Sequence, residues 1–149
     1  MSIYKHILVS TDGSELSEKA ANHALELAKL TGADLVAITV TPSYPVTYLE
    51  GSMPINSDQA KEIEAKWRAE SQKYVASIEE AGRQQGVAVQ AIIVNNDNIS
   101  EAILKTAAEK NVDLIIMASH GRKGIARLLL GSETQHVLTN AKVPVLVLR

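Results

Sequence analysis

Short apolar runs alternate with helical patterns along the whole chain, and this alternation limits the possible folds more than any other feature. The runs are rich in β-branched residues and have the length of a strand: His6–Ser10, Leu35–Val40, Val87–Val94, Leu114–Ala118 and Val143–Leu148. Most lack the period-two alternation of a strand with one wet face. This is typical of strands that are buried on both faces of a parallel sheet.

Between these runs, apolar residues recur three or four positions apart, which predicts helices that each lay one apolar stripe on the sheet. The four patterns span Leu16–Ala28, Ile63–Ala81, Ile99–Ala107 and Val137–Ala141. Strand–helix alternation favours right-handed βαβ units and a parallel sheet. We therefore expect an α/β fold, an open Rossmann-like sandwich with helices on both faces, in which residues 1–149 form a single domain.

Several residues mark where the predicted helices begin and end. Asn98 and Ser132 are each followed three residues later by Glu or Gln, which predicts a capping box at both positions. Gly32 and Gly86 each follow a helical pattern, where a left-handed residue is favoured.

Composition excludes several classes of protein. The 149 residues include no Cys, which rules out a disulfide framework, a thiolate metal site and a thiol nucleophile. The net charge of −2, with no run of Lys or Arg, argues against a nucleic-acid partner. No stretch approaches the roughly 20 apolar residues of a membrane helix, and the first residues do not resemble a signal peptide. We therefore expect a cytoplasmic protein with no membrane association.

Ligands of open α/β sheets bind beyond the carboxyl ends of the strands, where the strand order reverses. Four segments lie there in the predicted fold. They are Ser10–Ser14, the long irregular stretch Thr41–Ser57 after Val40, Asn95–Asn98, and Ser119–Thr134. A loop as long as the second is usually functional or mobile.

The segment after the fourth predicted strand is the most informative. Its glycines at 121, 124 and 131 would let the backbone approach a ligand closely. Gly131 and Ser132 directly precede a helix, whose free N–H groups and positive dipole end suit a phosphate. Hydroxyl donors and cations lie nearby: Ser132, Thr134, Arg122, Lys123 and Arg127. These features predict a phosphate cradle, although neither a P-loop nor a G-x-G-x-x-G motif is present.

Each of these residues also has a structural interpretation. Asp12 and Ser132 would serve as helix caps without any ligand, Gly121 could simply form a tight turn, and Arg122 could be solvated. His120 is the one candidate general base, but no Ser or Cys pairs with it in a recognisable motif. We expect no catalytic residue and no metal site.

Three segments together resemble the universal stress protein family over the whole length of the chain. Tyr4–Ser14 is similar to the family's opening strand and acidic turn, and Val143–Val147 to its last strand. Met117-Ala118-Ser119-His120-Gly121, nine residues, and then Gly131-Ser132 is similar to its nucleotide loop, G-x-x-G, nine residues, G-[ST]. The first glycine of that motif is replaced by Ala118 here.

The resemblance implies a five-stranded parallel sheet of order 3-2-1-4-5 and a homodimer formed partly through Val143–Leu148. It also implies that ATP, whose phosphates could carry Mg²⁺, binds at the carboxyl ends of strands 1, 2 and 4. Adenine would lie near Val40 and Met117, and Asp12 would face the adenine–ribose region. The nucleotide-binding residues would be Ser10, Thr11, Asp12, Val40, Met117, Ala118, Gly121, Arg122, Gly131, Ser132, Glu133 and Thr134.

Three functions remain open at this stage. The first is a dimeric stress-response regulator that binds an adenine nucleotide and is not an enzyme. The second, suggested by Ala118, is a dimeric interaction protein of the same family that does not use nucleotide. The third is a slow ATPase, for which the sequence offers no evident base or water-positioning residue.

Overall fold

The computed structural model describes residues 3–43, 57–121 and 130–149, and in these the chain forms five strands and four helices. Along the chain they are β1 (His6–Ser10), α1 (Glu15–Thr31), β2 (Asp34–Thr41), α2 (Ser57–Gln85), β3 (Val89–Asn95), α3 (Ile99–Glu109), β4 (Leu114–Ala118), α4 (Ser132–Asn140) and β5 (Val145–Leu148). All strand pairs are parallel, and the sheet order is β3-β2-β1-β4-β5. The predicted α/β fold and strand order are confirmed.

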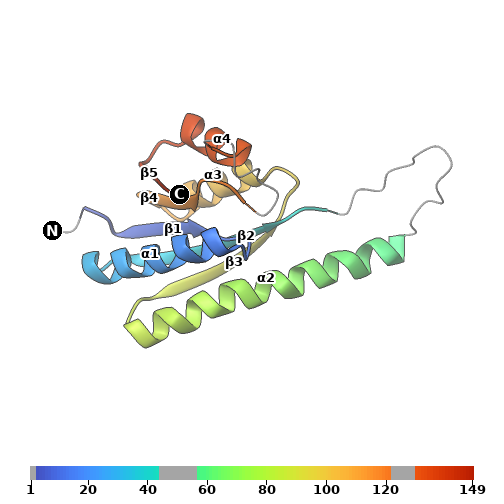
Figure 1. Ribbon diagram of the computed structural model, residues 1–149, viewed down its shortest axis with the longest axis horizontal. Coiled ribbons are helices and arrows are strands. Elements are labelled where there is room, and N and C mark those ends of the chain that lie inside the picture. The colour runs from blue at the N-terminus through green and yellow to red at the C-terminus, as the bar shows by residue number, and fades with distance from the viewer. Residues whose placement is uncertain (1–2, 44–56, 122–129) are drawn as a thin grey trace.

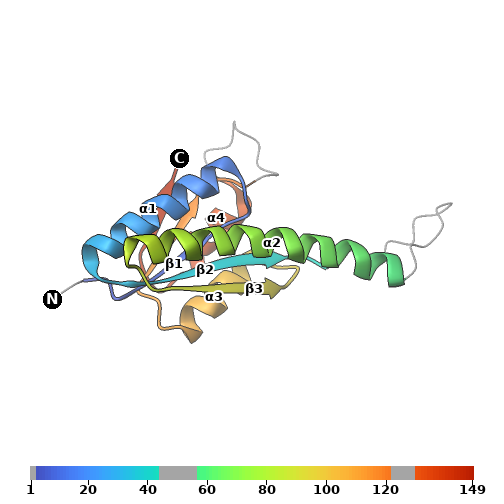
Figure 2. The same ribbon diagram turned by 90° about the horizontal axis from the view of Figure 1, so that it is seen from below.

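The helices cover both faces of the sheet, as Figures 1 and 2 show. Helices α1 and α2 pack on the face that carries Ile7, and α3 and α4 on the face that carries Leu8. Both of these neighbouring side chains are fully buried. Burial on both faces explains why β1 shows no polar–apolar alternation. Each such side chain contributes roughly 1.5–3 kcal/mol on burial.

The strand bounds agree with the predicted runs at β1 and β4 and shift by one or two residues elsewhere. The last strand begins at Val145 rather than Val143. Pro144 lies just before it and, having no N–H, contributes only its carbonyl, which accepts from Ile115 N at 3.0 Å.

Helix α2 is much longer than its apolar pattern indicated. It has 29 residues, about 43 Å at 1.5 Å per residue, whereas the eight residues of β2 span about 26 Å. Its amino-terminal part therefore extends beyond the sheet (Figure 2). Most of the predicted irregular stretch Thr41–Ser57 lies outside the described residues.

Three of the predicted helix ends are confirmed, and one is wrong. Asn98 caps α3, with its side chain accepting from Glu101 N. Gly32 and Gly86 adopt φ values of 73° and 76° after α1 and α2. Ser132, however, is the first residue of α4 and not its cap, because the first turn closes on Gly131: Gln135 N donates to Gly131 O at 3.0 Å.

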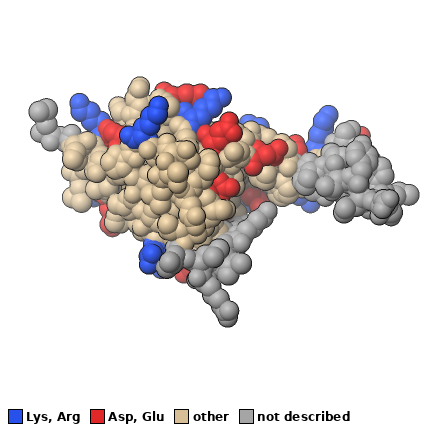
Figure 3. All heavy atoms as spheres, turned by 90° about the horizontal axis from the view of Figure 1, so that it is seen from above, with Lys and Arg blue, Asp and Glu red and all other residues tan. Residues whose placement is uncertain are grey.

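The two edge strands of the sheet are β3 and β5. The four side chains of β5, Val145–Leu148, are only half-buried. Figure 3, which looks onto the α4 and β5 side of the molecule, shows a broad area there without Lys, Arg, Asp or Glu.

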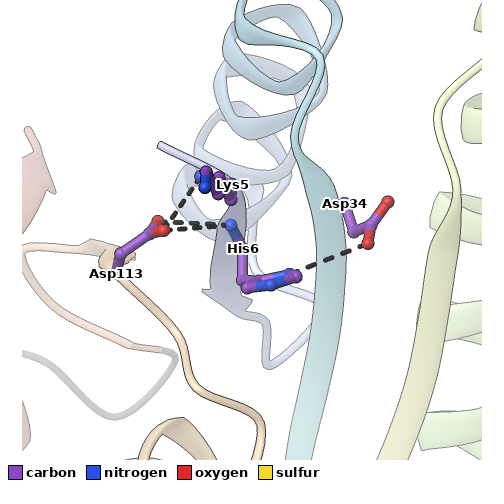
Figure 4. Close-up of polar contacts among 4 residues, drawn as sticks. All are labelled: Lys5, His6, Asp34 and Asp113. Atoms are coloured by element: carbon purple, nitrogen blue, oxygen red, sulfur yellow. Dashed lines mark hydrogen bonds and ion pairs between the residues drawn. The ribbon is translucent and has the colours of Figure 1, made fainter. Parts of the chain in front are cut away.

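The amino ends of β1, β2 and β4 are held together by polar contacts, drawn in Figure 4. The Asp113 carboxylate accepts from Lys5 N at 2.9 Å and from His6 N at 3.2 Å, and Asp113 N donates to His6 O at 2.8 Å. His6 Nδ1 lies 3.7 Å from Asp34 Oδ2. These contacts fix the sheet at the end opposite the predicted site.

Candidate functional site

The turn after β1 is held by a chain of hydroxyl groups. Ser17 Oγ donates its proton to Ser14 O at 2.9 Å, so Thr11 Oγ1, 3.1 Å away, donates to Ser17 Oγ. Thr11 Oγ1 in turn accepts from Gly13 N at 3.3 Å. The Ser14 side chain caps α1 by accepting from Ser17 N. These hydrogen bonds hold the turn without any ligand. They also fix the direction of the Asp12 side chain, which lies between Thr11 and Gly13.

Asp12 bridges two loops. Its Oδ1 accepts from Ser14 N at 2.9 Å, which is the Asx turn typical of Asp at a helix start. Its Oδ2 lies so close to Gly121 that a Cβ added there would stand 2.6 Å from it. The cap of α1 is therefore Ser14 and not Asp12, which instead braces the turn before the helix. Asp12 does lie close to the post-β4 loop, as the sequence suggested.

The start of α4 is fastened to the end of β4. Thr134 is 2% exposed, and its hydroxyl donates to Ala118 O at 2.9 Å. Gly131 N donates to Ser119 O at 2.7 Å, and a Cβ at Gly131 would lie 3.3 Å from that same oxygen. Because a hydroxyl has one proton, Thr134 does not offer it to a phosphate in this arrangement.

These segments surround a cavity of about 120 Å³ at the carboxyl ends of the strands. Nine of the twelve predicted residues line it: Ser10, Thr11, Asp12, Val40, Met117, Ala118, Gly121, Glu133 and Thr134. Its described lining also includes four residues that were not predicted: Ser17, Ile99, Ile103 and His120. Ile99 is the first residue of the helix that follows the Asn95–Asn98 loop at the same edge of the sheet, and Ile103 lies one turn further along it. That place in the chain is the sequence signal by which they could have been found.

Three predicted residues are not among the described lining. Gly131 packs against the backbone of Ser119 and His120, and Ser132 is exposed at the start of α4. Arg122, like Lys123, lies outside the described residues. His120 does reach the cavity, and its Nδ1 lies 3.2 Å from Ser119 Oγ.

The Glu133 carboxylate is engaged by a neighbouring helix. Its Oε2 accepts from the backbone N of Ser100, at the start of α3, at 2.9 Å. On the next turn of α4, His136 Nδ1 lies 2.7 Å from Ser100 Oγ. The starts of α3 and α4 are therefore linked beside the cavity.

A larger hollow of about 430 Å³ lies between α1 and α2, and it shares Thr11 with the first cavity. The charged side chains that line it, Glu18 and Lys73, are exposed. It does not gather the ends of several strands, so we take the smaller cavity as the candidate site.

Other classes of site find no support in the described part of the chain. Among those residues, no three His, Asp or Glu side chains are grouped so that they could hold a metal ion. None of the helices described is both long and apolar enough to cross a membrane.

Comparison with known proteins gives a consistent result. Residues 3–149 match the Universal stress protein family. Universal stress protein MJ0531 of Methanocaldococcus jannaschii is 35% identical over 149 residues, which cover 99% of this chain and 83% of the relative.

Solved structures share the fold. Protein MJ0577 of the same archaeon superposes with a TM-score of 0.82 at 31% identity, over 98% of this chain and 96% of that one. UspA from Lactobacillus plantarum gives 0.87 at 21% identity, over the full length of both chains. Two further family structures contain ligands. One is a complex with cAMP (TM-score 0.70, 23% identity, 98% and 97% covered), and one, from Archaeoglobus fulgidus, is a complex with dAMP (0.64, 20%, 99% and 99%).

Proposed function

The chain belongs to the universal stress protein family, and we propose from this premise that it is a cytoplasmic regulatory protein that binds an adenine nucleotide. We take ATP as the ligand and residues 1–149 as one domain. Family structures in complex with cAMP and dAMP support the adenine part of the proposal. The observation that carries it is the gathering of nine predicted residues from β1, β2, β4 and α4 around one cavity.

The chemistry of the cavity fits one half of a nucleotide. Val40 and Met117 give it apolar walls suited to a base, and Asp12 also lines it, so that a ribose hydroxyl could donate to its carboxylate. At about 120 Å³ it is smaller than the 300–1,000 Å³ typical of ligand pockets, so the phosphates would lie outside it.

The phosphates would then reach the start of α4. The N–H groups at Ser132 and Glu133 begin that helix, and its positive end would favour their charge. We place the phosphates there, with Arg122 and a Mg²⁺ ion that the phosphates carry. When bound, that ion would neutralise phosphate charge.

The direct test is the melting temperature of nucleotide-stripped protein with Mg-ATP, and with Mg-GTP as the control. A ligand at 100 times its Kd stabilises by about 2.7 kcal/mol, which for a chain of this size raises Tm by about 5–11 °C. We expect that shift with ATP and none with GTP. No shift at millimolar ATP would refute the proposal.

A glycine variant ties the shift to the site. Gly121→Ala places a methyl group on Asp12 Oδ2 and must displace that carboxylate, so it should reduce the ATP shift. Gly86→Ala is the matched control, because a Cβ there meets nothing within 4 Å. It should lower Tm through its φ of 76° while leaving the ATP shift unchanged. An equal ATP shift in both variants would contradict the assignment of Asp12 to the site.

A second candidate is a dimeric interaction protein that does not use nucleotide. The Ala118 methyl group on the cavity wall favours it, since the family motif has glycine there. Both candidates share the proposed homodimer through Val143–Leu148. Its support is the half-buried edge strand and the uncharged area around it in Figure 3.

The edge strand offers a sharp test of the dimer. The carbonyls of Pro144 and Leu148 point to β4, where they accept from Ile115 N and Ser119 N. Since successive backbone groups of a strand alternate in direction, those of Val147 point outward. Val147→Pro removes one outward N–H and leaves the β4 pairing intact. We expect a dimer of the wild type in sedimentation equilibrium and a monomer of the variant. A monomeric wild type would refute the dimer.

A further inference from the structure

The first turn of α3 is satisfied by a side chain from another helix. The first N–H groups of a helix have no partner within it, and Ser100 N donates to Glu133 Oε2 of α4 at 2.9 Å. Ser100 is 3% exposed. A carboxylate at a helix start is favoured both by the charge-assisted hydrogen bond and by the helix dipole.

The Ser100 hydroxyl makes a second link to α4. It donates to Asn98 Oδ1 at 3.0 Å, an atom that also accepts from Glu101 N and is therefore the amide oxygen. Because this uses the only hydroxyl proton, the 2.7 Å contact with His136 Nδ1 must be a donation from the imidazole. Glu133 and His136 thus hold the same residue of α3 from two successive turns of α4.

This link adjoins the cavity. Ile99 and Ile103 of α3 form part of its wall, and Glu133 and Thr134 of α4 line it as well. Helix α4 is itself fixed to β4 through the Thr134 hydroxyl. The position of the isoleucine wall relative to the strand ends therefore depends on the contacts between Ser100 and α4.

We infer that Glu133, together with Ser100 and His136, is a positioning group: it acts on a bound nucleotide through the α3 wall and not by contact with the phosphates. The inference rests on the proposed nucleotide-binding function. It assigns to Glu133 a role different from the direct contact that the family resemblance implied. The wall formed by Ile99 and Ile103 belongs to the apolar half of the site. Removal of Glu133 should therefore lower the affinity for the nucleoside part of the ligand.

The two roles differ in how affinity depends on phosphate number. If Glu133 positions α3, its removal weakens adenosine, AMP and ATP by the same factor. If its carboxylate acts on the phosphates, the effect is absent for adenosine and grows from AMP to ATP, because charge interactions add with each phosphate.

Titration calorimetry with adenosine, AMP and Mg-ATP decides between them. We expect Glu133→Ala to weaken the binding of all three ligands alike, by about twofold to thirtyfold, the range for residues that modulate binding from outside the ligand contacts. Glu133→Gln keeps an acceptor oxygen and should recover part of the loss. Glu101→Ala, an exposed first-turn glutamate of α3, is the matched control and should change nothing. Unchanged affinities in Glu133→Ala, or a change that grows with phosphate number, would overturn the inference.

Hydrogen exchange of the Ser100 amide gives a readout that needs no nucleotide. Protection should fall in Glu133→Ala, return in part in Glu133→Gln and stay at the wild-type level in Glu101→Ala. Unaltered protection in Glu133→Ala would refute the positioning contact itself. A wild-type protein that binds none of the three ligands would refute the proposed function instead, so the two failures can be told apart.

Discussion

Gly13 is the residue at which a single methyl group should do the most damage to the turn that carries Asp12. Its φ is +79°, in the left-handed region. A Cβ built there would stand 2.2 Å from Cζ of the Tyr74 ring, which α2 lays across the turn. Gly13→Ala therefore combines an unfavourable backbone conformation with a steric overlap.

The two contributions can be separated with controls from the same chain. Gly32 has nearly the same φ, +73°, and a Cβ there meets nothing within 4 Å. Gly32→Ala should therefore lower the free energy of unfolding by the conformational cost alone, about 1–2 kcal/mol. Gly13→Ala should add the cost of overpacking, about 1–3 kcal/mol, for a total loss of about 2–5 kcal/mol.

Urea unfolding at equilibrium measures these differences, provided that the slope m stays constant among the variants. In a Tyr74→Ala background the steric part should vanish, and Gly13→Ala should then cost the same as Gly32→Ala. The reasoning is refuted if Gly13→Ala costs no more than Gly32→Ala in the wild-type background. It is equally refuted if removal of the Tyr74 ring does not reduce the penalty.

Two further predictions concern polar groups at either end of the sheet. Thr39 Oγ1 is buried without a hydrogen-bond partner among the described residues, so Thr39→Val should raise the free energy of unfolding by about 1–3 kcal/mol. Thr41→Val is the control: it removes a bonded hydroxyl on the same strand and should not raise the free energy of unfolding. Equal effects of the two substitutions in urea unfolding would contradict this reasoning. Asp113→Ala removes the acceptor of Lys5 N and His6 N and should lower Tm by several degrees. Asp113→Asn keeps one acceptor oxygen and should lower Tm less. An Asp113→Ala variant as stable as the wild type would contradict the role of this contact.

Much of the fold could be predicted because apolar runs and helix caps depend on residues that are close together in the sequence. β1 and β4 were placed at their observed bounds, since runs buried on both faces stand out in any sequence. The α3 start at Asn98 was also predictable, because that cap depends on residues three apart. The strand order, in contrast, came from the family resemblance, since periodicity says nothing about which strands are neighbours.

The errors arose where long-range contacts decide the local structure. Ser132 has the sequence of a cap, but the cap is Gly131 and Ser132 is already the first residue of α4. Thr134, in its first turn, donates to Ala118 O, and Gly131 donates to Ser119 O. Both contacts tie α4 to a strand more than ten residues away, and no capping pattern contains that information. Ile99 and Ile103 were missed as cavity residues for a related reason: an apolar stripe does not reveal which of its members reach the edge of the sheet.

The hydrogen bonds around the cavity indicate how it would recognise a ligand. The single protons of the Thr11, Ser17 and Thr134 hydroxyls are all donated to protein atoms, and Glu133 accepts from the start of α3. These side chains therefore hold the site together through hydrogen bonds within the protein, and their donated protons are not offered to a ligand. A nucleotide held here would be recognised by apolar walls, by Asp12 and by the backbone N–H groups at the start of α4. The fixed positions of those groups depend on the hydroxyl contacts. We therefore expect the loss of one such hydroxyl to weaken the binding of the base as much as that of the phosphates. The reason is that the hydroxyl acts on the shape of the site and not through a contact with the ligand.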